Sequence, residues 1–263
     1  MRAFSLLLFI TLMMVFAACK SDSPDQAADS DQQEEVVKKY PITPFSKSAD
    51  FPDAKIESMT YEGSRFVFQI SGTSYQLGVQ TPDAGQKMCA NSAEGQHIHL
   101  IIDRNPYSAH YVPSFDHEIE DGTYNLLAFL SRSYHESIKT EDARVAQRVR
   151  VENGGIVSSE ELDGPTLFYS RPKGTYVGED TKKIMVDFYP INVEIGEDYK
   201  VKLQVNGEVT LLDKWQPYYI ENLPMGDNTI GIALVYPDGS PVPGQQTAIL
   251  NRISLQKDPL PEQ

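Results

Sequence analysis

The chain has 263 residues, with 23 Lys plus Arg against 37 Asp plus Glu, so its formal net charge at pH 7 is -14. This acidic excess excludes a protein that binds nucleic acid through a diffuse basic surface. Hydrophobic residues make up 40% of the chain and charged residues 23%. These values are typical of globular proteins, and they exclude both a wholly disordered chain and a multi-span membrane protein.

The chain begins with a segment typical of a secretory signal peptide. Arg2 precedes an apolar run over residues 3–16, and two alanines stand directly before Cys19. The run is short for a membrane-spanning helix. Small residues before a cysteine resemble the lipobox of bacterial lipoproteins, in which the thiol receives a lipid. We therefore predict a signal peptide over residues 1–18 and lipidation of Cys19, with an ordinary secretory signal as the alternative.

An acidic segment follows the predicted lipidation site. Residues 20–35 contain six Asp or Glu and no large apolar side chain, so they cannot bury enough surface to fold. We predict a flexible tether over residues 19–50 that connects the lipid bilayer to the folded body. Lys20 replaces the aspartate that retains lipoproteins in inner membranes, which favours the outer membrane. The sequence does not decide between the periplasmic and the cell-surface side of that membrane.

From residue 51 onward the sequence alternates between short apolar segments and turn residues. This pattern is typical of β-strands, and only residues 141–146 indicate a helical turn. Turn pairs such as Asp121-Gly122 and Asn206-Gly207 separate the segments at spacings suited to β-sandwiches. We predict an all-β body with nine strands, over residues 66–70, 97–102, 124–130, 145–151, 167–170, 184–189, 199–205, 218–220 and 230–236.

The two halves of this body are similar to one another. Residues 97–103 align with 200–206, and each segment is followed by a glycine turn and an apolar strand. We predict two tandem immunoglobulin-like β-sandwich domains, each of about 100 residues. The predicted domains cover residues 51–153 and 154–257, and a tail covers 258–263. A single large sandwich is the alternative.

Two histidines share one face of a predicted strand. Side chains alternate along a strand, so Ile98, Leu100 and Ile102 point into the core. His97 and His99 then point outward, and we do not expect them to be core residues.

All five histidines of the chain fall between residues 97 and 135. An H-x-H pair can present two imidazoles to one ion, and His110 or His135 can complete a site for Zn²⁺ or Cu²⁺. The predicted metal ligands are therefore His97, His99, His110 and His135. The alternative is a solvated face that bears histidines, with no cofactor.

A cationic, hydroxyl-rich pair of segments stands out in this acidic protein. Arginine and lysine side chains bind phosphate or carboxylate through charge-assisted hydrogen bonds, and domain junctions are common binding sites. We predict an anionic ligand, such as a phosphorylated peptide, near the junction. The residues predicted to bind it are Arg132, His135, Arg171, Lys173, Tyr107 and His110. Alternatively, Arg132 and Arg171 pair with acids such as Glu136 and Asp180 to fix the domain interface.

Four segments, GQHIH (95–99), PYSAHY (106–111), LAFLSRSYHES (127–137) and FYSRPKGTY (168–176), resemble a family of Bacteroidota lipoproteins named phosphopeptide-binding proteins. The resemblance covers residues 51–255. It implies a secreted, lipid-anchored, non-enzymatic protein of β-sandwich type.

The sequence contains no G-x-S-x-G elbow, no H-E-x-x-H and no P-loop, so we predict that the protein is not an enzyme. Apart from Cys19, the chain has one cysteine, Cys89, which we predict to be a packing thiol because no base lies near it in sequence. We expect a lipid-anchored cell-envelope binding protein. A structural scaffold for envelope partners is a further alternative.

Overall fold

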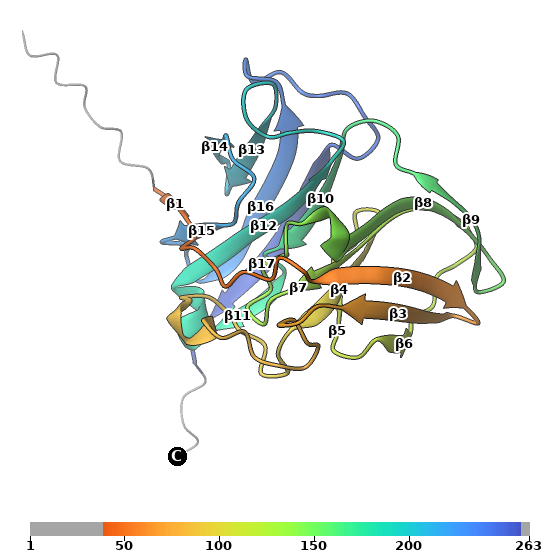
Figure 1. Cartoon of the computed structure of the whole chain (residues 1–263). Coiled ribbons are helices and arrows are strands. Elements are labelled where there is room, and N and C mark those ends of the chain that lie inside the picture. Colours follow the sequence, from red (N-terminus) through yellow and green to blue (C-terminus); the bar gives the residue numbers. More distant parts are fainter. Residues whose placement is uncertain (1–38, 259–263) are drawn as a thin grey trace, which may run out of the picture. The chain divides into compact units, whose positions relative to one another are not determined.

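The computed structural model describes residues 39–258, which belong to one compact unit (Figure 1). The predicted signal peptide, Cys19 and most of the predicted tail lie outside the described residues. Within residues 39–258, no helix is both long and apolar enough to cross a membrane.

Four antiparallel or mixed sheets make up the described residues. The first half holds a three-stranded sheet and a five-stranded sheet, with strand orders β2-β3-β6 and β5-β4-β7-β8-β9. Their bounds are β2 (Lys55–Glu62), β3 (Arg65–Ser71), β4 (His97–Ile102), β5 (Ser108–His110), β6 (Ser114–Asp116), β7 (Gly122–Ser131), β8 (Arg144–Glu152) and β9 (Gly155–Glu161).

The second half, joined by the early strand β1, forms a four-stranded sheet and a five-stranded sheet. Their strand orders are β1-β15-β12-β10 and β11-β17-β16-β13-β14. Their bounds are β1 (Ile42–Pro44), β10 (Thr166–Arg171), β11 (Gly174–Val177), β12 (Lys183–Ile191), β13 (Lys200–Val205), β14 (Glu208–Leu212), β15 (Tyr218–Glu221), β16 (Gly226–Val235) and β17 (Ala248–Gln256). Three short 3-10 turns accompany the strands: η1 (Ala84–Gln86), η2 (Glu141–Ala143) and η3 (Gly178–Thr181).

Each half encloses its own apolar core between two sheets. In the first half, Phe66 and Phe68 of β3 pack against Ile98, Leu100 and their neighbours on the five-stranded sheet. In the second half, Val186 of β12 packs in the same core as Leu203 and Ile232. The predicted all-β fold with tandem sandwiches is therefore confirmed, and each predicted strand overlaps an observed one.

A third apolar cluster joins the two sandwiches. Ile101 of β4 and Phe129 of β7 lie in one cluster with Phe168 of β10 and Tyr189 of β12. The five-stranded sheet of the first half thus buries both of its faces here, and all six residues of β4 are buried. A strand covered on both faces is apolar without strict alternation, as in the run Leu100-Ile101-Ile102.

Two predicted boundaries differ from the structure. Asn153 and Gly154 form the turn of the β8–β9 hairpin (Figure 1), with φ of 51° and 72°, so the predicted boundary at 153/154 falls inside a hairpin of the first sandwich. The predicted tether over 19–50 is wrong for its last part, because β1 pairs with β15 and Tyr40 is buried. Tyr40 and Ile42 pack against the core of the second sandwich, whereas the sequence of residues 20–35 contains no large apolar side chain that could do so.

Candidate metal centre

His97 and His99 lie on β4, on the face opposite to the first core. We expected both side chains to point outward, with a solvated face as the alternative to a metal site. The solvated face is wrong, because both side chains have 0% exposure. The alternation of β4 was predicted correctly, since Ile98 and Leu100 belong to the first core. The second face is also covered, because the second sandwich packs against it through Phe168 and its neighbours.

His135 reaches the same place from the loop that follows β7. In this loop the backbone N–H of Arg132 donates to the carbonyl of Glu136, and that of His135 donates to the carbonyl of Arg132, both at 2.9 Å. His135 has a φ of 70°, the left-handed conformation that glycine or asparagine usually supplies in such hairpin loops. Histidine, like asparagine, is one of the residues other than glycine that adopt this conformation most often, so the loop can present an imidazole at this position.

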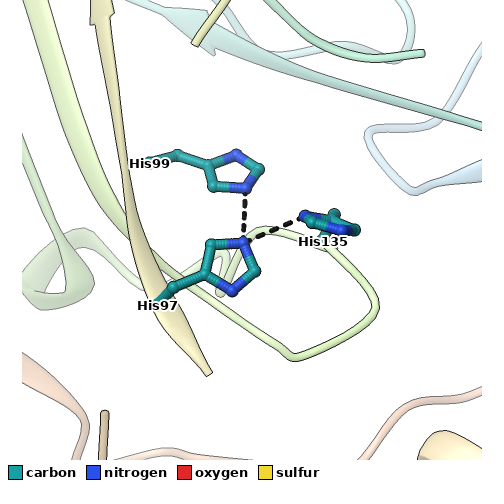
Figure 2. Close-up of side chains that lie close together, drawn as sticks. All are labelled: His97, His99 and His135. Carbon is teal, nitrogen blue, oxygen red and sulfur yellow. Dashed lines mark hydrogen bonds between the residues drawn. The ribbon is translucent and has the colours of Figure 1, made fainter. Parts of the chain in front are cut away.

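The three rings converge through one nitrogen each. The Nε2 of His97 lies 2.8 Å from the Nε2 of His99 and 3.0 Å from the Nδ1 of His135. The three nitrogens all lie within 4.8 Å of one another. Figure 2 shows His97 and His99 projecting side by side from one strand, with the ring of His135 turned toward them.

The hydrogen bonds of His97 define its tautomer. Its Nδ1 lies 2.8 Å from the carbonyl oxygen of Gly95, which can only accept, so Nδ1 carries the proton and Nε2 presents a lone pair. Burial lowers the pKa of His97 to about 4, so the ring is neutral at neutral pH. A single lone pair on His97 therefore faces two ring nitrogens, those of His99 and His135.

The other two rings are also held neutral and oriented. Burial, followed by the charges of neighbouring residues, lowers the pKa values of His99 and His135 well below the usual range. The Nδ1 of His99 lies 3.2 Å from the hydroxyl oxygen of Ser170 on β10, and the Tyr107 ring stacks on His99 at 3.6 Å between centroids. The Tyr107 hydroxyl lies 3.3 Å from the Nδ1 of His135.

His110, the fourth predicted metal ligand, lies on the other face of the sheet. Its strand β5 pairs with β4 so that His110 is opposite Ile98, and paired residues share a face. The His110 ring stacks on Phe115 of the first core, with 3.3 Å between ring centroids. Its inclusion in the metal and ligand sets was therefore wrong.

Two cations from the second sandwich border the triad of His97, His99 and His135. Arg171 is only 6% exposed, yet its guanidinium donates to the Tyr176 hydroxyl at 3.1 Å and forms no ion pair within 4.0 Å among the described residues. The Lys173 ammonium lies 3.8 Å from the centroid of the Tyr107 ring. Burial and the charge of Arg171 lower the pKa of Lys173 to about 8.

Arg132 has a structural role instead. Its guanidinium donates to the carbonyl of Ala49 at 2.6 and 3.0 Å and to that of Ser137 at 3.1 Å, and it lies 3.7 Å from the Glu136 carboxylate. The predicted pairing with Glu136 is therefore confirmed, and three of the five N–H donors of Arg132 are used within the protein. The predicted contact of Arg132 with a ligand stays a prediction. The corresponding pairing of Arg171 with Asp180 is not formed within 4.0 Å.

Sequence reasoning identified the three converging histidines and Tyr107, which stacks on His99, but missed Gly95 and Ser170. Gly95 and Ser170 orient the rings, and nothing in their local sequence indicates this role, since Ser170 comes from the other sandwich. Cys89 is partly buried, and burial raises the pKa of its thiol to about 12, in keeping with the packing role that we predicted.

No protein-family model matches the chain, and no curated protein matches it. Among solved structures, the chain is similar to fibronectin(III)-like modules of Clostridium thermocellum CbhA, with 16% identity and a TM-score of 0.28 over 35% of this chain and 98% of that chain. It is also similar to the extracellular domain of a hybrid two-component system from B. thetaiotaomicron, with 11% identity and a TM-score of 0.26 over 78% of this chain and 38% of that chain. Both likenesses are distant, so neither bears on the chemistry of the site.

Proposed function

We propose that the protein is a lipid-anchored, non-enzymatic envelope protein that binds one divalent transition-metal ion between His97, His99 and His135. The observation that carries this proposal is that two ring nitrogens compete for one acceptor nitrogen of His97. The single lone pair of His97 faces two imidazole nitrogens at 2.8 and 3.0 Å. A bound metal ion accepts a lone pair from each of the three rings and removes this conflict.

The residues around the triad support metal ligation. Metal-binding histidines usually donate their second N–H to a carbonyl, carboxylate or water, which fixes the ring. His97 does this through the Gly95 carbonyl. The Ser170 hydroxyl can accept from His99 in the same way, because a hydroxyl both donates and accepts.

A hydrolytic role has less support. Ser170 and His99 form a hydroxyl–imidazole pair, but both side chains are buried, with 1% and 0% exposure. A nucleophile must reach its substrate, and this pair does not.

The anchor and the location belong to the same proposal. Lipidation of Cys19 and attachment to the outer membrane rest on the sequence pattern of residues 1–35. Mass spectrometry of the mature N-terminal peptide tests them, since a diacylglyceryl cysteine at position 19 is expected. An unmodified cysteine there would remove the anchor from the proposal.

Metal analysis of untagged protein, purified without chelator and reloaded with Zn²⁺ or Cu²⁺, tests the metal function. We expect about one ion per chain and none in a His97→Ala plus His99→Ala variant. His110→Asn is the matched control, because His110 lies on the opposite face of the sheet. Equal metal content in wild type and the double variant would place the ion elsewhere and contradict the proposal.

Anion binding is a second candidate function, and the burial of Arg171 favours it. A buried guanidinium without a carboxylate partner is costly unless an anion completes it. An oxyanion such as a phosphorylated side chain would contact Arg171 and Lys173. Calorimetry with matched phosphorylated and unphosphorylated peptides tests this, with Arg171→Gln expected to lose binding. Equal affinity for the two peptides would exclude phosphate recognition.

A further inference from the structure

The spacing of the triad nitrogens distinguishes between coordination geometries. With metal–nitrogen bonds of about 2.0–2.1 Å, two ligands of a tetrahedral ion lie about 3.4 Å apart, and two ligands at a right angle lie about 2.9 Å apart. The His97 Nε2 lies 2.8 Å from the His99 Nε2 and 3.0 Å from the His135 Nδ1. As hydrogen-bonded contacts, both distances lie closer to the right-angle spacing than to the tetrahedral one, with His97 between the other two, and the nitrogens of His99 and His135 lie within 4.8 Å of each other.

Packing holds the decisive pair at this spacing. His97 and His99 are two residues apart on a strand that is buried on both faces. His97 is held by the Gly95 carbonyl, and His99 is held between the Ser170 hydroxyl and the stacked Tyr107 ring. Close-packed interiors resist such displacements. The partly exposed His135 has more freedom, but its movement leaves the His97–His99 distance unchanged.

The donor set narrows the choice of metal further. The triad offers three imidazole nitrogens, and no sulfur or carboxylate belongs to this group among the described residues. Nitrogen ligands in a square or tetragonal arrangement favour Cu²⁺ or Ni²⁺, and Cu²⁺ binds most tightly in the series that runs through nickel, copper and zinc.

The charges beside the triad act on both ions alike. Arg171 and Lys173 act on the His99 and His135 rings, and they oppose the entry of any cation. Because Cu²⁺ and Zn²⁺ carry the same charge, this repulsion lowers the affinity for both and leaves the choice between them to the nitrogen ligands and their geometry.

We infer that the triad of His97, His99 and His135 is a copper site, which selects Cu²⁺ over Zn²⁺ through the right-angled arrangement of its nitrogens. This inference rests on the proposed function, namely that the triad binds a metal ion at all. It adds the identity of the ion and the structural feature that selects it. Ser170 and Tyr107 then serve as positioning residues that keep His99 close to His97.

Competition between the two metals tests the inference. The untagged full chain is titrated with Cu²⁺ and with Zn²⁺ against a chromogenic chelator, and the copper form is measured by electron paramagnetic resonance. We expect one Cu²⁺ per chain, an affinity at least about a hundredfold higher than for Zn²⁺, and an axial spectrum with splitting from three nitrogens. His110→Asn should leave the affinity ratio unchanged.

The outcomes separate this inference from the proposed function. If Zn²⁺ binds as tightly as Cu²⁺, or if the copper spectrum indicates a tetrahedral site, copper selection is overturned and metal binding stands. Failure of both ions to bind overturns the two together. A ratio that changes in His110→Asn places the ion away from the triad and also overturns the inference.

Discussion

His135 occupies a left-handed backbone conformation that few residues other than glycine adopt, so its backbone and its ring have separate roles. Its φ of 70° suits asparagine about as well as histidine, whereas alanine pays the full steric cost of the left-handed region. The ring, by contrast, belongs to the triad. Substitutions can therefore separate the strain of the loop from the chemistry of the ring.

We predict that His135→Asn and His135→Ala both lower metal affinity at least about tenfold, and that only His135→Ala destabilises the metal-free protein, by about 1 kcal/mol. Urea unfolding in the presence of a chelator measures the stabilities, and metal titration measures the affinities. Wild-type affinity in His135→Asn would show that the ring is not a ligand.

His110, on the opposite face of the sheet from the triad, adds a pH dependence of its own to the stability of the fold. Burial lowers its pKa to about 4 in the folded protein, below the usual value of about 6.5. Between these values the unfolded chain binds the proton more readily, so the neutral ring contributes stability that is fully present above pH 6.5 and is lost as the pH falls toward 4.

We predict that His110→Phe, which keeps a ring against Phe115, reduces the loss of stability between about pH 6.5 and 4. Urea midpoints of wild type and variant across this interval measure the effect. An identical pH dependence in the two proteins would mean that His110 titrates normally.

At the scale of elements, the loop that carries His135 is held by the segment that leads into the first sandwich. Arg132 donates twice to the carbonyl of Ala49, and the Ser48 hydroxyl donates to the Glu136 carboxylate. Residues 48–49 thus form hydrogen bonds to the loop on both sides of His135, at Arg132 and Glu136. This segment follows β1, which belongs to the second sandwich.

Arg132→Ala is predicted to destabilise the protein by about 2–3 kcal/mol, because it removes charged hydrogen bonds and leaves the Glu136 carboxylate without its cation. Metal affinity should fall as well, since His135 loses its support. Arg132→Lys keeps the charge and should recover part of both. Chemical unfolding and metal titration of the three proteins measure this. Unchanged metal affinity in Arg132→Ala would show that the hydrogen bonds of Arg132 do not position His135.

Most strands inside the sheets were predicted from sequence, whereas seven of the eight missed strands among the described residues lie at sheet edges. The exception is β17, which lines the second core and was also missed. β4 was predicted with its observed bounds because every second residue, Ile98, Leu100 and Ile102, is apolar and faces the first core. β9 was missed, since its second half, Ser158–Glu161, is exposed and polar, and β1 was missed because it has only 3 residues. The burial of His97 and His99 could not be predicted from β4 alone, because the cover comes from residues about 70 positions later.

At the scale of the whole molecule, a buried ion pair joins the sandwiches close to the site. Asp187 of β12 has 0% exposure, and its carboxylate accepts from the Lys139 ammonium at 2.7 Å and from the backbone N–H of Ser137 at 2.8 Å. Ser137 closes the loop that carries His135 through a bridge to Ser131. The second sandwich is therefore needed to shape a site whose three rings all come from the first.

Asp187→Asn is predicted to lower the free energy of unfolding by about 2–4 kcal/mol, because Lys139 loses its partner in a largely buried position. A Lys139→Met plus Asp187→Asn variant should be less destabilised than the sum of its single changes. Urea unfolding of the four proteins measures the coupling. Additive effects would show that the pair contributes little.

The most direct test is a crystal structure of the metal-loaded protein, with anomalous scattering measured at the absorption edge of the ion. We predict one peak at about 2.0–2.1 Å from the Nε2 of His97, the Nε2 of His99 and the Nδ1 of His135. A peak elsewhere on the chain, or none between these three nitrogens after loading, would contradict the proposed metal site.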